Sequence, residues 1–103
     1  MSDSLLPRAD DVLAAAARIA PHASVTPVLR SRTLDALAGA QLAFKAEHLQ
    51  RGGAFKFRGA CNAVWSLDAD RAIAGVVTHS SGNHGAALAL AARTRGMPCH
   101  VVV

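Results

Sequence analysis

The residue of this sequence with the clearest chemical potential is Lys56, which lies between Phe55 and Phe57 in the glycine-containing segment 52–60. Two aromatic neighbours could shelter the amine from water, and the glycines let the backbone approach a ligand closely. Because desolvation disfavours the ammonium form, a sheltered lysine becomes a better nucleophile and can form a Schiff base with a carbonyl group. The alternative is an ordinary exposed lysine on an amphipathic segment, since most lysine side chains stay in water.

A second set of polar side chains lies in the loop 80–85, whose sequence is Ser-Ser-Gly-Asn-His-Gly. If a helix begins at this loop, its N–H groups and its dipole favour an anion there, and the serine hydroxyls add donors. The same residues serve equally well as a helix cap without a ligand. His84 could contact a ligand or carry a proton, or could be hydrogen-bonded within its own loop. The residue types leave these alternatives open, and they do not separate a phosphate from a carboxylate.

The segments around the two loops predict an open α/β fold with a mostly parallel sheet flanked by helices. A short apolar strand at 75–79, of the type found inside parallel sheets, a helix at 83–95 and a strand at 99–103 form one β-α-β unit. The helix is apolar nearly all round, which indicates packing between two layers. Ligands of such folds bind beyond the carboxyl ends of the strands, where loop 80–85 lies.

Hydrophobic periodicity predicts the remaining elements. A helix at 10–20, capped by Asp10 or Asp11, carries an apolar stripe of Val12, Leu13, Ala16 and Ile19. We further expect an extended piece at 28–29, helical turns at 33–38, a strand at 41–47 with Leu42, Phe44 and Ala46 on one face, a helix from 55 or 56 to 67, and a polar turn at 68–71.

Composition and charge argue against several classes of protein. No apolar run approaches the roughly 20 residues that a membrane crossing needs, and residues 1–8 lack the features of a secretory signal, so a cytoplasmic protein is expected. The net charge is +4, but the arginines are scattered, which disfavours a nucleic-acid partner. Two cysteines are too few for a disulfide framework, and the cysteines and histidines lack metal-ligand spacing, so no metal site is expected.

The apolar residues 101–103 end the sequence inside a strand that we expect to be buried. A complete domain rarely ends on a bare apolar strand. We therefore expect an N-terminal fragment of a longer protein, and we expect these 103 residues alone to be inactive and poorly soluble.

The segments 45–60 and 78–85 together resemble the pyridoxal-phosphate enzymes of fold type II, the tryptophan-synthase-β fold. The resemblance extends over residues 24–103 and is strongest to the serine/threonine dehydratase and serine racemase branch, which shares Lys-Phe-Arg-Gly at 56–59 and Gly-Asn-His-Gly at 82–85. Two departures are Ala54, where relatives commonly have serine, and Gly52, where many have a polar residue. The resemblance implies a two-domain enzyme, with residues 1–74 in the large cofactor-lysine domain and 75–103 beginning the small domain.

The resemblance also implies a role for each matching residue. Lys56 would hold pyridoxal 5'-phosphate covalently and act as the base on the substrate Cα proton, with Phe55 packed near the cofactor ring. Asn83 would donate a hydrogen bond to the pyridoxal 3'-oxygen, and Ser81 matches the opposite-face acid/base of the racemases. The substrate carboxylate would be bound by Ser80, Ser81, Asn83 and His84.

The function that the resemblance implies is β-elimination of L-threonine or L-serine to a 2-oxo acid and ammonia. The alternatives are a serine racemase, or an inactive fragment of such an enzyme that only binds anions. A homo-oligomer is expected for the full-length protein, since relatives assemble in this way, and the sequence does not separate serine from threonine.

Overall fold

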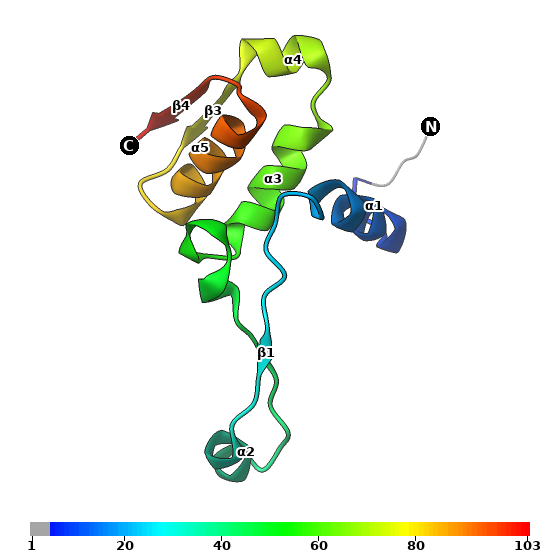
Figure 1. Cartoon of the computed structure of the whole chain (residues 1–103), viewed down its shortest axis with the longest axis vertical. Helices are drawn as coiled ribbons and strands as arrows, with labels where there is room; N and C mark the ends of the chain where they lie inside the picture. The colour runs from blue at the N-terminus through cyan, green and yellow to red at the C-terminus, as the bar shows by residue number, and fades with distance from the viewer. Residues whose placement is uncertain (1–4) are drawn as a thin grey trace.

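The structure is a computed structural model that describes residues 5–103, and it has the mixed α/β architecture predicted from the sequence (Figure 1). Within these residues there are two two-stranded sheets, one antiparallel and one parallel. No helix in residues 5–103 has the length and hydropathy that a membrane crossing requires. The expected lack of a signal sequence concerns residues 1–8, of which residues 1–4 lie outside the described part of the chain.

Helix α1, Ala9–Ile19, lies within one residue of the helix predicted at 10–20. Its first turn is held by Asp11, whose carboxylate accepts a hydrogen bond from the Arg8 backbone N–H at 2.7 Å. The predicted apolar stripe is largely wrong, because Ile19 is buried but Val12 and Leu13 are exposed. Helix α1 touches α3, Lys56–Ser66, and Arg18 donates to Asn62 at 2.6 Å. A cavity of about 310 Å³ where α1 faces α3 is lined in part by Val12, so this part of the stripe is not covered.

Residues 28–45 form an arm that extends away from the rest of the chain (Figure 1). Strand β1, Val28–Leu29, pairs antiparallel with β2, Phe44–Lys45, and helix α2, Arg32–Ala38, lies at the far end of the arm. The predicted strand at 41–47 is therefore wrong in length and environment, and Phe44 is exposed. The reason is that a two-residue partner strand supports only two paired residues, and the chain turns into the 3-10 helices η1, Glu47–Leu49, and η2, Arg51–Gly53.

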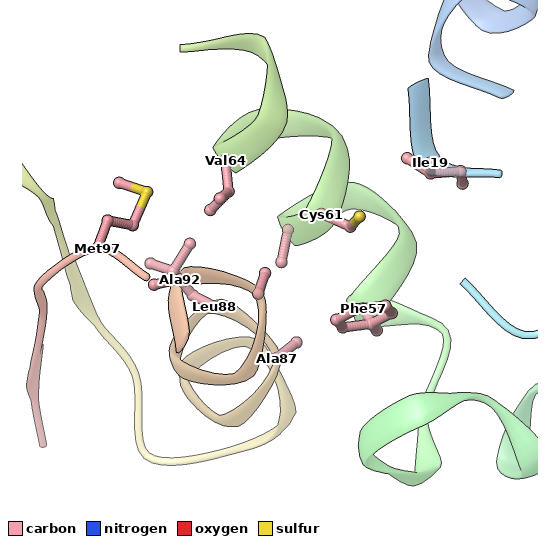
Figure 2. Packing of buried hydrophobic residues seen from close by; sticks show 10 residues of the cluster. Ile19, Phe57, Cys61, Val64, Ala87, Leu88, Ala92 and Met97 are labelled. Atoms are coloured by element: carbon pink, nitrogen blue, oxygen red, sulfur yellow. The ribbon is translucent and has the colours of Figure 1, made fainter. Parts of the chain in front are cut away.

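The hydrophobic core lies between α3 and α5, Asn83–Arg95 (Figure 2). Both helices were predicted within one residue of their observed bounds, and both present buried residues at helical spacing. The domain boundary predicted at residue 74 stays a prediction, although this core draws on residues from both sides of it. The buried residues are Phe57, Ala60, Cys61 and Val64 of α3, and Ala87, Leu88, Ala91 and Ala92 of α5.

The parallel strands β3, Val76–His79, and β4, Cys99–Val102, are joined by α5, as the β-α-β prediction requires. Helix α5 lies between α3 and this sheet, which confirms that it is packed between two layers (Figure 1). The other face of the sheet is open, and Val77 is 71% exposed. Burial of both faces of these strands stays a prediction for the full-length protein. Where a polar turn was predicted, Asp68 caps a short helix, α4, Ala69–Ala74.

Gly75, which precedes β3, is the glycine whose replacement should cost the most stability. Its φ of 89° is one that other residues rarely adopt, and a Cβ there would lie 2.6 Å from the Pro98 carbonyl oxygen. We expect Gly75→Ala in the full-length protein to lower the free energy of unfolding by about 2–4 kcal/mol, measured by urea denaturation. Gly59→Ala is the control, because a Cβ in this helix meets nothing within 4 Å. Equal effects of the two changes would contradict this account.

Candidate active site

Lys56 and the helix that follows loop 80–85 meet at one pocket of about 420 Å³. The first residue of α3 is Lys56 itself, and His84 lies in the first turn of α5, so close packing of the two helices brings both side chains to the pocket. Much of the lining is apolar, which suits an aromatic ligand. The lining residues are Phe55, Lys56, Arg58, Gly59, Ala60, Ala63, His84 and Leu88.

The amine of Lys56 has one of its two expected aromatic neighbours. Its Nζ lies 5.4 Å from the centroid of the Phe55 ring, whereas Phe57 is fully buried in the core. Consecutive residues of an α-helix point about 100° apart, so Lys56 and Phe57 cannot occupy the same side of α3. Lys56 is also exposed in residues 5–103, and the predicted shelter by two phenylalanines is therefore wrong.

Loop 80–85 uses one of its serines to begin α5. The Ser80 Oγ accepts hydrogen bonds from the backbone N–H groups of Gly82 and Gly85, at 3.2 Å and 3.0 Å. The N-cap residue itself is Gly82, and Asn83 is the first residue of the helix, so the predicted cap by Asn83 or a neighbouring serine is wrong. Ser80 instead accepts from the Gly85 N–H of the first turn, from a position two residues before the N-cap. Gly85 packs against the sheet, since a Cβ there would lie 3.0 Å from Val101 Cγ1. The absence of a side chain at Gly85 therefore allows the helix to pack on the sheet. Of the two glycines of the loop, only Gly82 has open space around it, as expected beside a ligand.

The remaining polar groups of the loop are available to a ligand. Ser81 and Asn83 are exposed, and their side chains have no hydrogen-bond partner within residues 5–103. Phe55, Lys56 and His84 line the pocket, whereas Ser80, Ser81 and Asn83, which lie just before or at the start of α5, do not. The roles expected for these six residues stay predictions.

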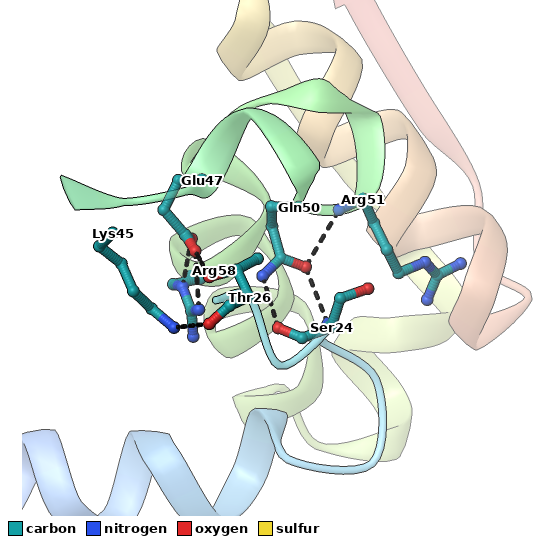
Figure 3. Close-up of polar contacts among 7 residues, drawn as sticks. All are labelled: Ser24, Thr26, Lys45, Glu47, Gln50, Arg51 and Arg58. Carbon is teal, nitrogen blue, oxygen red and sulfur yellow. Dashed lines mark hydrogen bonds and ion pairs between the residues drawn. The ribbon is translucent and has the colours of Figure 1, made fainter. Parts of the chain in front are cut away.

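A polar network beside the pocket was missed by the reasoning from the sequence (Figure 3). The Glu47 carboxylate accepts hydrogen bonds from the guanidinium of Arg58, with Nη2 to Oε2 at 2.9 Å, and from the hydroxyl of Thr26. Lys45 Nζ donates to the Thr26 carbonyl oxygen at 2.5 Å. The sequence signal was only that the segment 45–60 contains the charged residues Lys45, Glu47 and Arg58.

The network lowers the pKa of Glu47 from 4.5 to about 2, chiefly through the hydrogen bond from Arg58 and then that from Thr26. A carboxyl group whose pKa is lowered by folding stabilises the protein above pH 4.5, and this contribution is lost as the pH falls towards 2. We expect the free energy of unfolding of the full-length protein to fall less steeply over this range in Glu47→Gln, measured by urea denaturation at several pH values. The exposed Asp70→Asn change should leave the slope as it is; an unchanged slope in Glu47→Gln would contradict the prediction.

A lysine amine, an apolar pocket and a helix N-terminus rich in hydrogen-bond donors thus lie next to one another. Residues 19–103 match the family model described as "Pyridoxal-phosphate dependent enzyme", and the chain belongs to this family. Within the family, the chain is 63% identical over 86 residues to serine racemase of Arabidopsis thaliana, with 84% of this chain and 26% of that protein covered.

Two further comparisons agree with this assignment. The chain is 54% identical over 98 residues to beta-hydroxyaspartate dehydratase of Paracoccus denitrificans, with 95% of this chain and 31% of that protein covered. The solved structure of maize serine racemase superposes with a TM-score of 0.89 at 53% identity, covering 91% of this chain and 30% of that structure. The chain thus spans between a quarter and a third of the length of these relatives, consistent with the expected N-terminal fragment.

The residues present fit pyridoxal phosphate, the cofactor of this family. Lys56 offers a primary amine, the group that an aldehyde cofactor requires, at the edge of a pocket whose apolar lining suits an aromatic ring. Phe55 lies beside that amine, and Ser81 and Asn83 supply donors without partners in residues 5–103. Among the described residues, no three histidine, cysteine, aspartate or glutamate side chains gather where a metal ion could bind.

Proposed function

We propose that this chain supplies the lysine-bearing part of a pyridoxal-phosphate-dependent amino-acid racemase, with serine as the substrate. The observation that carries the proposal is the common pocket of Lys56 and His84, which joins the amine to the helix that follows loop 80–85. Identity of 63% to one serine racemase and a TM-score of 0.89 to another support racemisation ahead of the elimination favoured by the sequence alone. Cytoplasmic location and homo-oligomerisation stay predictions.

Racemisation requires that a proton leave one face of the substrate Cα and another arrive on the opposite face. Pyridoxal phosphate, when bound, withdraws electrons from the Cα–H bond and makes that proton removable. Lys56 would take the proton on one face, and the exposed hydroxyl of Ser81 would exchange a proton on the other. Loop 80–85 would bind the substrate carboxylate, because the first N–H groups of α5 and the donors of Ser81, Asn83 and His84 favour an anion.

A second candidate is β-elimination of a 3-hydroxy amino acid, which needs only one face of the substrate. The observation that favours it is the 54% identity to beta-hydroxyaspartate dehydratase over 95% of this chain. Lys56 would again take the Cα proton, and the β-hydroxyl would then leave as water. The two reactions share their first proton transfer and differ only in their later steps, so one protein can catalyse both.

The experiment begins with the full-length protein, pyridoxal phosphate and borohydride, followed by mapping of the reduced adduct. Attachment at Lys56 is the expected result, and a protein that binds no cofactor would refute both candidates. Incubation with L-serine then measures each activity, because racemisation forms D-serine whereas elimination releases pyruvate and ammonia. Release of pyruvate without any D-serine would reject the racemase and leave the lyase.

A further inference from the structure

The first turn of α3, which carries Lys56, has no local cap to hold it. The residue before the helix, Phe55, makes no side-chain hydrogen bond to it, and no acidic residue lies in the first turn. Helix N-terminal N–H groups and first-turn geometry are usually fixed by such residues. The position of Lys56 therefore depends on contacts made by the neighbouring residues Phe57 and Arg58.

Phe57 holds one side of this turn. Its ring is fully buried, and the guanidinium of Arg51 lies 4.9 Å from the ring centroid. Arg51 is itself held by the His22 carbonyl oxygen, to which its Nη1 donates at 3.0 Å. These contacts anchor the first turn of α3 in the core through Phe57, but they do not hold Arg58.

Arg58 holds the other side through Glu47. Two nitrogens of its guanidinium donate to the two carboxylate oxygens of Glu47, an arrangement that fixes orientation as well as distance. The Glu47 side chain is 17% exposed, and the same carboxylate accepts from Thr26, which is buried. Glu47 thus connects the Arg58 side chain to the segment before β1, which is anchored again where Gln50 pairs with the backbone of Ser24 at 2.9 Å in both directions (Figure 3).

We infer that Glu47, by binding Arg58 and Thr26 together, is a positioning residue that orients the first turn of α3 and so presents Lys56 to the cofactor. Arg58 follows Lys56 by two residues and lines the same pocket. If Arg58 loses its contact with Glu47, the first turn of α3 is free to rotate, and that rotation moves the Lys56 amine. The inference rests on the proposed function, because it concerns the residue that would hold pyridoxal phosphate. It extends that proposal to a carboxylate that does not itself line the pocket.

The test measures how fast pyridoxal phosphate becomes attached to Lys56 in the full-length protein, with borohydride trapping at timed intervals. Because misplacement of a reacting group costs rate steeply, we expect Glu47→Gln to slow attachment about tenfold or more. Arg58→Lys keeps the charge but loses the planar two-nitrogen contact, so it should slow attachment to a smaller degree. If Glu47→Gln does not fold, Arg58→Lys still tests whether the contact between Glu47 and Arg58 sets the attachment rate. The double variant Glu47→Gln/Arg58→Gln should be no slower than Glu47→Gln, since both changes remove one interaction.

Two matched variants separate positioning from general loss of stability. Asp68→Ala removes the hydrogen bond to the Arg71 N–H that caps α4, and should lower the unfolding midpoint without changing the attachment rate. Arg71→Lys alters an exposed ion pair, 3.8 Å in length, and should also leave the rate unchanged. If the wild-type protein attaches the cofactor at Lys56 and both Glu47→Gln and Arg58→Lys do so at the wild-type rate, the positioning role is overturned and the proposed function is not. Absence of attachment in the wild type would overturn the proposed function, and this inference with it.

Discussion

Lys56→Ala in the full-length protein is expected to abolish the borohydride-trapped adduct and to lower serine turnover at least about 10³-fold. The loss is large because one amine would both hold the cofactor and move the Cα proton, and general-base catalysis alone contributes about 10²–10⁴-fold. Racemisation and elimination should fall together, since both begin with that proton transfer. Turnover is measured as D-serine and pyruvate formed from L-serine.

Two other cationic residues, Lys45 and Arg93, provide the controls for this prediction. The sequence contains one further lysine, Lys45, whose amine donates to the Thr26 carbonyl oxygen at 2.5 Å, so the mapped adduct should be absent from it. Arg93→Ala changes an exposed residue in the last turn of α5, at the opposite end of that helix from the pocket, and should leave both activities unchanged. Wild-type turnover in Lys56→Ala, or an adduct that maps to Lys45, would refute the assigned role.

Ser81→Ala is expected to suppress racemisation about 10²-fold or more while elimination from one serine enantiomer continues at a substantial rate. The asymmetry follows from the proposed roles, because racemisation needs a proton on each face of the Cα whereas elimination needs only the face of Lys56. The Ser81 hydroxyl is exposed and makes no hydrogen bond within residues 5–103, so its removal should cost the fold little. The measurement compares D-serine formation with pyruvate release from each enantiomer.

The adjacent serine provides the contrast. Ser80 Oγ accepts from the N–H groups of Gly82 and Gly85, so Ser80→Ala should disturb the whole loop and reduce both reactions to a similar degree. The cost to stability should be about 1 kcal/mol, because the hydroxyl accepts from a first-turn N–H of α5 much as an N-cap side chain does. If Ser81→Ala reduced racemisation and elimination equally, Ser81 would not be the opposite-face acid/base.

Much of the fold around the pocket could be predicted from short stretches of sequence. The alanine-rich segment between loop 80–85 and Gly96 predicted α5. Gly96 also predicted where the helix ends, because a glycine in the αL conformation ends a helix efficiently, and the φ of Gly96 is 79°. The apolar run before Ser80 and the one after Pro98 specified two parallel strands on either side of that helix. Since ligands bind at the carboxyl ends of such strands, the sequence also predicted where a candidate site would lie.

The arm and the faces of the strands could not be predicted in the same way. Alternation in residues 41–47 indicated a half-buried strand, but the structure pairs only Phe44 and Lys45, with a two-residue partner. Alternation reports which residues share a face, and it carries no information about whether another element covers that face. The same limit applies to Val12 and Leu13, which share the apolar stripe of α1 and remain exposed.

The sequence by itself determined which groups can do chemistry, namely the Lys56 amine and the hydroxyl, amide and imidazole groups of loop 80–85, and it determined the helices and strands that carry them. Only the tertiary structure decided that Phe57 turns into the core while Phe55 stays beside the amine, and that Glu47 binds Arg58 and Thr26. The physical reason is the range of the interactions. Helix and strand signals arise between residues a few positions apart, whereas Glu47 meets partners 11 and 21 residues away, and that meeting exists only once the chain has folded.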